Sequence, residues 1–524
     1  MKGKQSNRIW NIVASIVLVL LLVIEGWLLW QIWKLNMLPV AYFIVLAVAL
    51  LLITAMLGLL MYRKRGGKWQ KNQVYGRQIV GYILSAVVIA GCLVAGNVVG
   101  RVQETIHAIT APEKINVVLE VYVRAGDEAQ YIQDAAEYTF GISQDVPEED
   151  SVKILRELES VMGAAVKTAS YPTSGNLLEA LLSGEVDVAI LNSTFLTVME
   201  EVDGYGDIQT RVRMLHELVI EKEVIPETKP AKAENPSEED ASTEGDKPTE
   251  EDKQEEKDVL SDPFLIYISG NDARRKELVD GGSDVNIMFL INPKSHQILM
   301  INTPRDYYIT NFASGKGAKD KLSHCGLKGI NNSILAMEDL YGQKVDYYAK
   351  INFSGFRTLV DAIGGVTIHS DIAFTTGKYY IYKGENHLNG EQALSFARER
   401  QHLSGGDNDR GKNQMKLISA MIKQLSVGNL ISNYADILKS LEGMFATSLS
   451  AEDIGRLVQL QLTEMPDWEI LTLAVTGENG TDLCWHTGYH AYVMYPHEHM
   501  VNHASQLMDR FLNGEVLTEA DMTP

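Results

Sequence analysis

The stretch SDVNIMFLINPKSHQILMIN, residues 283–302, decides the fold of the C-terminal half of this chain. It contains two apolar runs, VNIMFLIN and HQILMIN, joined by the four residues Asn292-Pro293-Lys294-Ser295. Apolar runs of this length that are bounded by turn residues are typical of buried strands, and a connection this short favours a β-hairpin. The stretch therefore predicts two neighbouring antiparallel strands of one sheet.

Strands and helices continue on both sides of this hairpin. The segment FLIYISGNDAR precedes it as a strand that runs into a turn, and KVDYYAKIN, VTIHS and WEILTLAV follow as strands. SGFRTLVDAIGG predicts a helix closed by glycine, and HLNGEQALSFARER predicts a helix in which Asn389 and Gln392 form a capping box. Another helix begins near Arg410. Residues 262–524 are therefore expected to form a mixed α/β domain with a central sheet flanked by helices.

A second, smaller α/β domain is predicted over residues 111–221. NVVLEVYVR is expected as a strand and GDEAQYIQDAAEY as an amphipathic helix, and further strands and helices alternate up to EVDVAILN. This alternation favours a small parallel sheet. The domain contains no recognisable catalytic constellation, so a spacer or docking role is the first interpretation and weak ligand binding is the alternative.

An acidic segment, residues 222–261, separates the two domains. Within it, residues 234–258 contain twelve Asp and Glu residues, three Lys residues and no aromatic residue. Such a composition buries too little apolar surface to fold and repels itself. The segment is expected to be a disordered tether.

Three apolar stretches near the N-terminus, at about residues 12–33, 38–62 and 79–100, are each long enough to cross a bilayer as a helix. Residues 1–110 are therefore expected to form a membrane domain. Lysine and arginine residues are concentrated before the first stretch and between the second and third. The positive-inside rule then places the N-terminus in the cytoplasm and everything from about residue 101 outside.

The overall charge argues against one class of partner. The number of cysteines leaves one disulfide possible. The formal net charge of −21 argues against nucleic acid as a partner, because a phosphate backbone recruits basic surfaces. Of three cysteines, Cys92 lies in an apolar stretch, which leaves Cys325–Cys484 as the one disulfide that cysteine number permits. The distance between these two thiols cannot be read from the sequence.

Acidic and basic side chains gather near the ends of the predicted elements. Asp272 follows one strand and Asp284 leads into the next, so both carboxylates could share a hard divalent cation such as Mg²⁺. Arg305 follows the hairpin, and Arg410 and Gln414 lie four residues apart on one helix face. A guanidinium binds phosphate oxygens in pairs, and a helix N-terminus favours an anion. The combination predicts a site for a pyrophosphate.

Ordinary structural roles remain as alternatives for these residues. Arg398 and Arg400 could pair with Glu399, Asp407 or Asp409, and exposed ion pairs of this kind are common and weak. Asp272 and Asp284 could be turn residues.

Several motifs follow one another over about residues 262–425, in the order GND, SDVNIMFLINP, TPRD, DKLSHC, INFSGF, LVDAIGGV, LNGEQALSFARER and GDNDRGKNQ. In sequence and order, they resemble the motifs of the LytR-CpsA-Psr (LCP) family of cell-wall glycopolymer transferases. The three membrane spans followed by an extra α/β domain are similar to the capsule-associated CpsA branch. The resemblance implies an LCP catalytic domain that transfers a polysaccharide, such as capsular polysaccharide, from a polyprenyl-pyrophosphate carrier to a peptidoglycan hydroxyl. A module that binds or regulates the lipid-linked glycan, or a pyrophosphatase, is the alternative function.

The resemblance also implies roles for individual residues. Asp272 and Asp284 match the carboxylates that hold Mg²⁺, for which Mn²⁺ is a possible substitute. Lys321 is placed near the phosphates, and Asp407 is expected to orient Arg410. The residues implied to clamp the pyrophosphate are Arg305, Arg398, Arg400, Arg410 and Gln414.

Two positions depart from the common family pattern, and one role stays open. Gly282 and Asn413 stand where many members have an arginine. Asp306 is a candidate general base for the acceptor hydroxyl, with a salt bridge to Arg305 as the alternative. The partners implied are the lipid-linked glycan, peptidoglycan, the lipid of the cell membrane and capsule-assembly membrane proteins.

Overall fold

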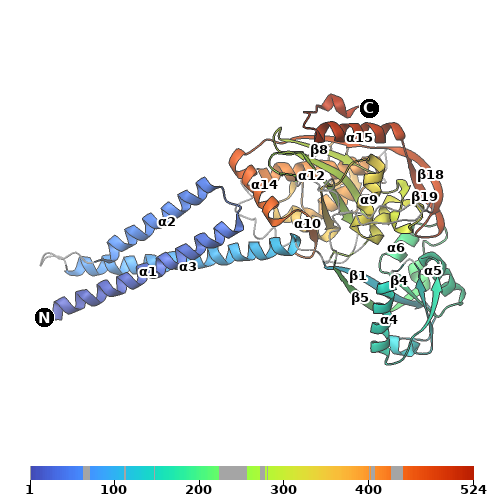
Figure 1. Cartoon of the computed structure of the whole chain (residues 1–524), viewed down its shortest axis with the longest axis horizontal. Coiled ribbons are helices and arrows are strands. Elements are labelled where there is room, and N and C mark those ends of the chain that lie inside the picture. Colours follow the sequence, from blue (N-terminus) through green and yellow to red (C-terminus); the bar gives the residue numbers. More distant parts are fainter. Residues whose placement is uncertain are drawn as a thin grey trace, which may run out of the picture.

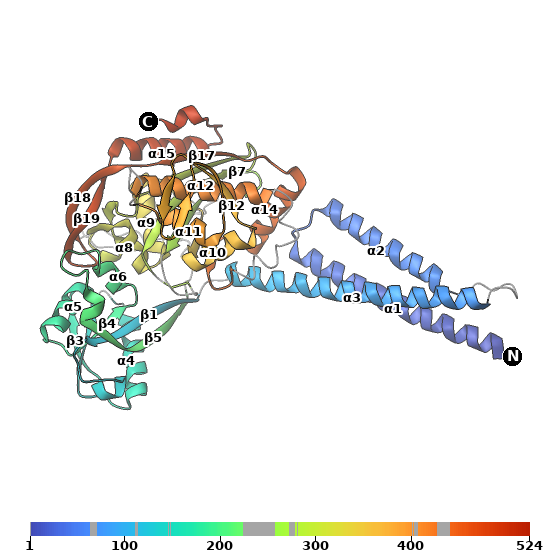
Figure 2. The ribbon, with the colours of Figure 1, turned by 180° about the vertical axis from the view of Figure 1, so that it is seen from behind.

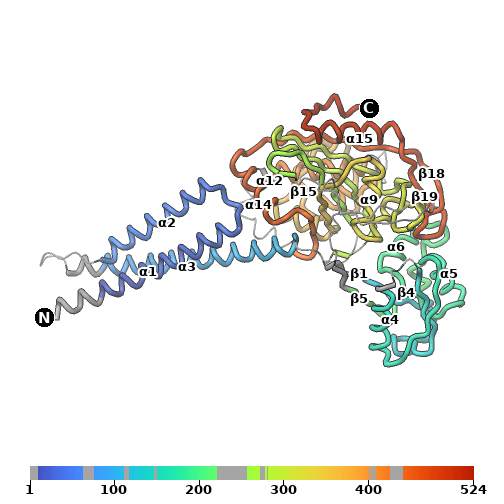
Figure 3. The backbone as a smooth tube through the Cα atoms, viewed as in Figure 1, coloured from blue at the N-terminus to red at the C-terminus, as the bar shows by residue number. Residues whose placement is uncertain are grey.

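The computed structural model describes residues 2–62, 71–110, 114–144, 146, 148–223, 257–271, 278–279, 281–400, 402, 407–426 and 441–524. Three long helices project from one end of the molecule, and two domains with sheets lie at the other end (Figure 1). Seen from behind, the smaller domain lies below the larger one and away from the three helices (Figure 2). The backbone tube shows that the C-terminus lies beside α15 (Figure 3).

The N-terminal helices are α1 (Lys2–Leu35), α2 (Val40–Met61) and α3 (Lys71–Thr110). Within each of the ranges Trp10–Leu35, Val40–Met61 and Gly76–Thr110, a stretch of 18 residues has a mean hydropathy between 2.4 and 2.9. All three are long and apolar enough to cross a membrane, which confirms the predicted number of apolar helices. The last turns of α3 pack through Ile106 and Ile109 against helix α14 (Ala451–Glu464) of the larger domain.

The larger domain is built on a six-stranded sheet with the order β16-β11-β6-β7-β8-β17. The predicted hairpin is present as β7 and β8, which pair antiparallel from Asn292↔Gln297 to Ile287↔Asn302. The strands of this sheet are β6 (Phe264–Asn271), β7 (Ser283–Asn292), β8 (Gln297–Asn302), β11 (Tyr347–Asn352), β16 (Phe445–Thr447) and β17 (Glu469–Ala474).

Helices cover both faces of this sheet because its strands are apolar on both sides. On β7, Met288 and Leu290 face a core formed with α9 and α15, whereas Ile287 and Phe289 face α12 and α14. The helices of this domain are α8 (Leu322–Cys325), α9 (Ile330–Tyr341), α10 (Phe353–Ala362), α11 (Gly390–Arg398), α12 (Asp407–Ser426), α14 and α15 (Glu498–Leu512). The mixed α/β architecture with a helix-flanked central sheet is confirmed.

Short two-stranded sheets complete the larger domain. Their strands are β9 (Tyr308–Thr310), β10 (Lys319–Lys321), β12 (Val366–Ser370), β13 (Phe374–Thr376), β14 (Tyr379–Ile381), β15 (Gly384–Leu388), β18 (Gly477–Cys484) and β19 (Tyr489–Pro496). The capping box that was predicted for α11 is present, with Asn389 and Gln392 each accepting from the other's backbone N–H.

The smaller domain has a five-stranded sheet with the order β3-β2-β4-β1-β5. Its elements are β1 (Lys114–Arg124), β2 (Thr139–Ser143), α4 (Glu148–Met162), β3 (Lys167–Tyr171), α5 (Ser174–Ser183), β4 (Val188–Asn192), α6 (Phe195–Met199), α7 (Ile208–Arg211) and β5 (Val212–Glu223). The prediction that this sheet is parallel was wrong for two of its strand pairs. Strands β2, β3 and β4 are parallel, but β1 pairs antiparallel with both β4 and β5.

The helix predicted over residues 126–138 was also wrong. The segment forms turns and one short 3-10 helix, Ile132–Ala135. The carboxylate of Asp134 accepts from the backbone N–H groups of Gln130 and Tyr131, and the carboxylate of Asp127 accepts from Ala129. Local side-chain acceptors of this kind compete with helical hydrogen bonds, which explains the difference.

The expected acidic tether is described only at its two ends. Residues 222–223 belong to β5, and residues 257–261 pack on the larger domain, where Val259 is fully buried. Lys257 Nζ lies 2.8 Å from Asp346 Oδ2. Residues 224–256 lie outside the described part of the chain.

Candidate active site

Asp284 and Arg305 meet at one edge of the central sheet. Because β7 and β8 are antiparallel, the beginning of β7 and the end of β8 lie at the same edge. Asp284 is the second residue of β7, and Arg305 follows β8 by three residues. The Nη1 atom of Arg305 donates to Asp284 Oδ1 at 2.6 Å, and both side chains are largely buried. The structure thus joins two residues that the sequence had assigned to the site.

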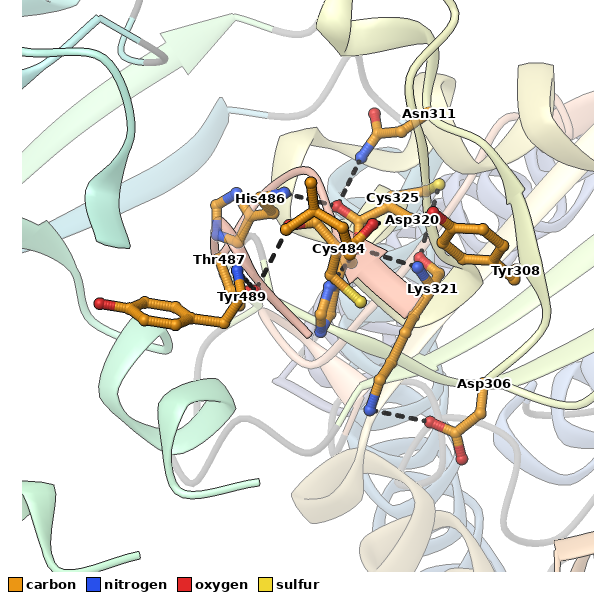
Figure 4. Close-up of polar contacts among 12 residues, drawn as sticks. Asp306, Tyr308, Asn311, Asp320, Lys321, Cys325, Cys484, His486, Thr487 and Tyr489 are labelled. Carbon is orange, nitrogen blue, oxygen red and sulfur yellow. Dashed lines mark hydrogen bonds and ion pairs between the residues drawn. The ribbon is translucent and has the colours of Figure 1, made fainter. Parts of the chain in front are cut away.

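Asp306 and Lys321 extend this cluster. Lys321 Nζ lies 3.4 Å from Asp306 Oδ1, and Arg305 Nε lies 3.7 Å from Asp306 Oδ2. Figure 4 shows the Lys321 side chain reaching from β10 towards Asp306. Asp306 is 3% exposed and Lys321 is 2% exposed. The structure therefore contains the salt bridge that was the alternative role for Asp306, and its action as a general base stays a prediction.

The smaller domain contributes a carboxylate that sequence reasoning missed. Glu201 follows α6, and its Oε1 atom accepts from Arg305 Nη2 at 2.5 Å while Oε2 lies 3.3 Å from Lys321 Nζ. Burial alone would raise the pKa of Glu201, but the charges of Arg305 and Lys321 and their hydrogen bonds lower this pKa to about 2. No local signal marks Glu201, which lies in an exposed turn more than one hundred residues before its partners.

Among the residues that the structure describes, carboxylates outnumber cations around Arg305. Asp284, Asp306 and Glu201 surround Arg305 and Lys321, which gives three negative and two positive charges. Burial lowers the pKa of Arg305, but the three nearby carboxylates outweigh it and hold this pKa well above the ordinary value. Two of the five N–H donors of Arg305 serve Asp284 and Glu201, so a phosphate at Arg305 would compete with these carboxylates.

The second half of the site is the junction between α11 and α12. Gln414 Oε1 accepts from Asn302 Nδ2 at 3.3 Å, and Gln414 Nε2 donates to the carbonyl of Ala397 at 3.4 Å. A side chain at Gly411 would overlap Asn302, so glycine lets α12 approach the end of β8 closely. Arg410 is 7% exposed in the first turn of the same helix. Asn302 thereby connects α12 to the strand that leads to Arg305.

The remaining predicted arginines lie at the surface near this junction. Arg398 ends α11, is exposed, and places its guanidinium 4.8 Å from the centre of the Phe353 ring. Arg400 is exposed two residues further on. Asp407 begins α12, but its side chain lies outside the described part, as does the whole of Asp272.

One buried oxygen atom in the strand adjacent to Asp284 is suited to a hard divalent cation. Asn271, the last residue of β6, pairs with Ser283 in the adjacent strand. Its side chain is 1% exposed, and its Oδ1 atom accepts from no atom in the part of the chain that is described. A buried amide oxygen and a carboxylate are both ligands that Mg²⁺ accepts.

A different group of metal-ligand side chains surrounds Asp320. Asp320, His324 and Cys484 are buried, and their ligand atoms lie within 4.8 Å of one another. Asp320 is already well supplied with donors, because Oδ1 accepts from Lys321 N and His324 Nδ1 at 2.9 and 2.6 Å and Oδ2 accepts from His486 N at 2.8 Å. Figure 4 shows this network converging on Asp320. We interpret the group as a hydrogen-bonded structural core of the loop that carries Lys321.

The cysteines do not form the disulfide that their number permits. Cys325 and Cys484 are both free and buried. The Sγ atom of Cys325 contacts the Lys321 carbonyl at 3.8 Å, and Sγ of Cys484 contacts the Asp482 carbonyl at 3.9 Å.

The two domains make several contacts close to the cluster. The hydroxyls of Tyr205 and Tyr489 lie 2.9 Å apart, and the rings of Phe195 and His486 meet edge to face at 5.6 Å. A side chain at Gly175 would overlap the backbone at Thr487. These contacts hold the smaller domain against the loop between β18 and β19.

Comparison with known proteins identifies relatives of the larger domain. A model of the LytR_cpsA_psr family matches residues 231–507. The polyisoprenyl-teichoic acid–peptidoglycan teichoic acid transferase TagU of Bacillus cereus is 30% identical over 227 residues, which are 43% of this chain and 73% of TagU. The protein of the same name from Bacillus licheniformis is 32% identical over 194 residues, covering 37% of this chain and 62% of that protein. The crystal structure of B. subtilis TagU aligns with 26% identity and a TM-score of 0.38, covering 49% of this chain and 100% of that one.

Proposed function

This chain belongs to the LytR_cpsA_psr family, and we propose on that basis that it transfers a glycopolymer from a polyprenyl-pyrophosphate carrier to a hydroxyl of peptidoglycan. The observation that supports this proposal most is the convergence of Asp284, Arg305 and Lys321 at one sheet edge. Phosphoryl transfer depends on positioning and on neutralising charge, and these residues supply both.

The chemistry assigns a task to each part of the site. An acceptor hydroxyl oxygen forms a bond to the phosphorus that carries the glycan, and the bond to the bridging oxygen breaks so that polyprenyl phosphate leaves. Arg305, Arg398, Arg400 and Arg410 bind the phosphate oxygens, and Gln414 helps to orient them. Asp306 or another carboxylate accepts the proton of the hydroxyl.

A magnesium ion fits the same sheet edge. Asp284, the amide oxygen of Asn271 and Asp272 would hold it. When bound, the ion neutralises negative charge on the phosphates. It would also compensate the excess of carboxylates around Arg305.

The three apolar helices support a position in the cell membrane. The basic residues at the start of α1 and between α2 and α3 favour a cytoplasmic N-terminus, with both domains on the outer side, where peptidoglycan is. Three spans and an additional α/β domain favour capsular polysaccharide as the transferred polymer over teichoic acid.

One reconstituted reaction tests the proposal. The purified full chain is incubated with a polyprenyl-pyrophosphate glycan, Mg²⁺ and peptidoglycan, and the products are analysed for a phosphodiester between glycan and peptidoglycan. Formation of this bond is the expected result. Binding of the donor without turnover would identify a binding or regulatory protein, and release of polyprenyl phosphate without transfer would identify a pyrophosphatase.

A further inference from the structure

A pocket of about 370 Å³ lies between the two domains next to Arg305. The larger domain provides one wall with Gly282, Asp284, Arg305 and Ser323. The smaller domain provides the opposite wall, from β1, α6 and the chain around Gln209. The volume lies within the range of small-molecule sites, which span roughly 300–1,000 Å³.

The charges on the pocket wall argue against an anionic ligand inside it. Among the described residues that line the pocket, Arg305 is the single lysine or arginine, whereas Glu120, Glu201 and Asp284 are acidic. Two of these carboxylates, Glu201 and Asp284, already hold the Arg305 guanidinium. The phosphates of a donor therefore belong at the margin of the pocket, and its interior suits an uncharged group.

Besides apolar side chains such as Leu196 and Met214, the pocket wall has polar groups that suit a ligand with several hydroxyls. Ser193, Thr194, Thr197 and Gln209 offer hydroxyl and amide groups that both donate and accept hydrogen bonds, and Tyr122 adds an aromatic side chain. Carboxylates accept hydrogen bonds from hydroxyl groups. These protein groups complement the hydroxyl groups that a sugar ring presents.

The pocket exists because of two features of this chain. The contacts of Tyr205 with Tyr489 and of Glu201 with Arg305 hold the second wall in place. In addition, Gly282 has no side chain to occupy the space. Among the described residues, a Cβ at Gly282 would meet the Ser323 carbonyl alone, at 3.6 Å, so those residues leave space beside it.

We propose that this interdomain pocket is a carbohydrate subsite, in which the smaller domain binds a sugar ring beside the phosphate clamp. The proposal rests on the glycopolymer transfer proposed above. The ring belongs either to the acceptor glycan, whose hydroxyl then lies next to Arg305, or to the donor glycan next to its phosphate. We assign the pocket to the acceptor, because its acidic wall is unfavourable for the donor's phosphate-bearing end.

The test uses the full chain with a lipid-pyrophosphate donor and disaccharide-repeat oligomers cut from peptidoglycan as the acceptor. Gln209→Ala and Thr197→Val remove one polar group each from the pocket wall, and Gly282→Leu fills the space. Thr210→Ala is the matched control, because Thr210 is exposed beside Gln209 and does not line the pocket. Both glycan transfer and water-dependent release of polyprenyl phosphate are measured.

Loss of one hydrogen bond should lower kcat/KM for the acceptor roughly 5- to 10-fold in Gln209→Ala and Thr197→Val, with little change in water-dependent release. Gly282→Leu should abolish transfer but keep release, which also shows that the variant is folded. A rise in the KM for the donor alone would still support a carbohydrate subsite, but it would overturn the assignment of this subsite to the acceptor. Unchanged kinetics for both substrates in all three variants would overturn the subsite itself, and absence of transfer by the unaltered chain would instead refute the proposed function.

Discussion

Glu201 Oε1 of the smaller domain lies 2.5 Å from Arg305 Nη2 of the larger domain. The other terminal nitrogen of Arg305 donates to Asp284. Both ends of the guanidinium are thus held by carboxylates at positions where phosphate oxygens are expected during the reaction. The smaller domain therefore directly contacts Arg305, a residue of the proposed phosphate clamp, which is more than a spacer would require.

Replacing Glu201 should strengthen the binding of a pyrophosphate. The variant Glu201→Gln removes one negative charge that competes for Arg305 and Lys321, so inorganic pyrophosphate should bind about 10-fold more tightly. Calorimetric titration of the detergent-solubilised full chain measures this affinity. Glu200→Gln is the control, because Glu200 is exposed and adjacent. Equal affinities for Glu201→Gln and the unaltered chain would show that Glu201 does not compete.

Acid should loosen the contact between the two domains. The docked Glu201 has a pKa of about 2, below the ordinary glutamate value of 4.5. A lowered pKa stabilises the docked state above pH 4.5, and this stabilisation is lost as the pH falls from 4.5 towards 2. The protection of residues 195–209 against hydrogen exchange, relative to the intrinsic exchange rate at each pH, should therefore fall below pH 4.5. In Glu201→Gln, the protection of these residues should not change over the same pH range. An equally large change in this variant would assign the effect to another titrating group.

Arg398 should matter for transfer and hardly at all for stability. Its side chain is exposed over Phe353, so Arg398→Ala should change the melting temperature very little. If Arg398 binds phosphate oxygens in the transition state, transfer should fall on the order of 100-fold. Arg357→Ala is a matched control, because Arg357 is an exposed arginine on α10 that pairs with Glu391. If Arg398→Ala and Arg357→Ala transfer glycan at equal rates, Arg398 does not bind the phosphates.

Asp320 should be essential for folding of the loop that carries Lys321. Asp320→Asn replaces a buried acceptor that serves Lys321 N, His324 and His486 N, and its new amide would face backbone N–H groups. Breaking such a buried network should cost roughly 3 kcal/mol in the free energy of unfolding. Chemical denaturation measures this value. Asp371→Asn, which alters the exposed pair with Lys416, should cost far less. A similar loss in both variants would contradict a structural role for Asp320.

Much of the fold could be read from local patterns. The hairpin of residues 283–302, the apolar helices and the capping box at Asn389 all depend on interactions within a few residues or on one element's own composition. The two errors in the smaller domain have different origins. Side-chain acceptors within residues 126–138 form turns in place of a helix, and the direction of β1 depends on strands far away in the sequence.

The sequence by itself determined which residue types are available to the site and which elements carry them, because strand, helix and cap signals are local. Only the tertiary structure decided that Glu201 holds Arg305, that Asn302 links Gln414 to the hairpin, and that a pocket remains beside Gly282. These relationships join side chains separated by about one hundred residues. Their energies come from burial and charge at contacts that exist only after the two domains have packed together, so no local pattern encodes them.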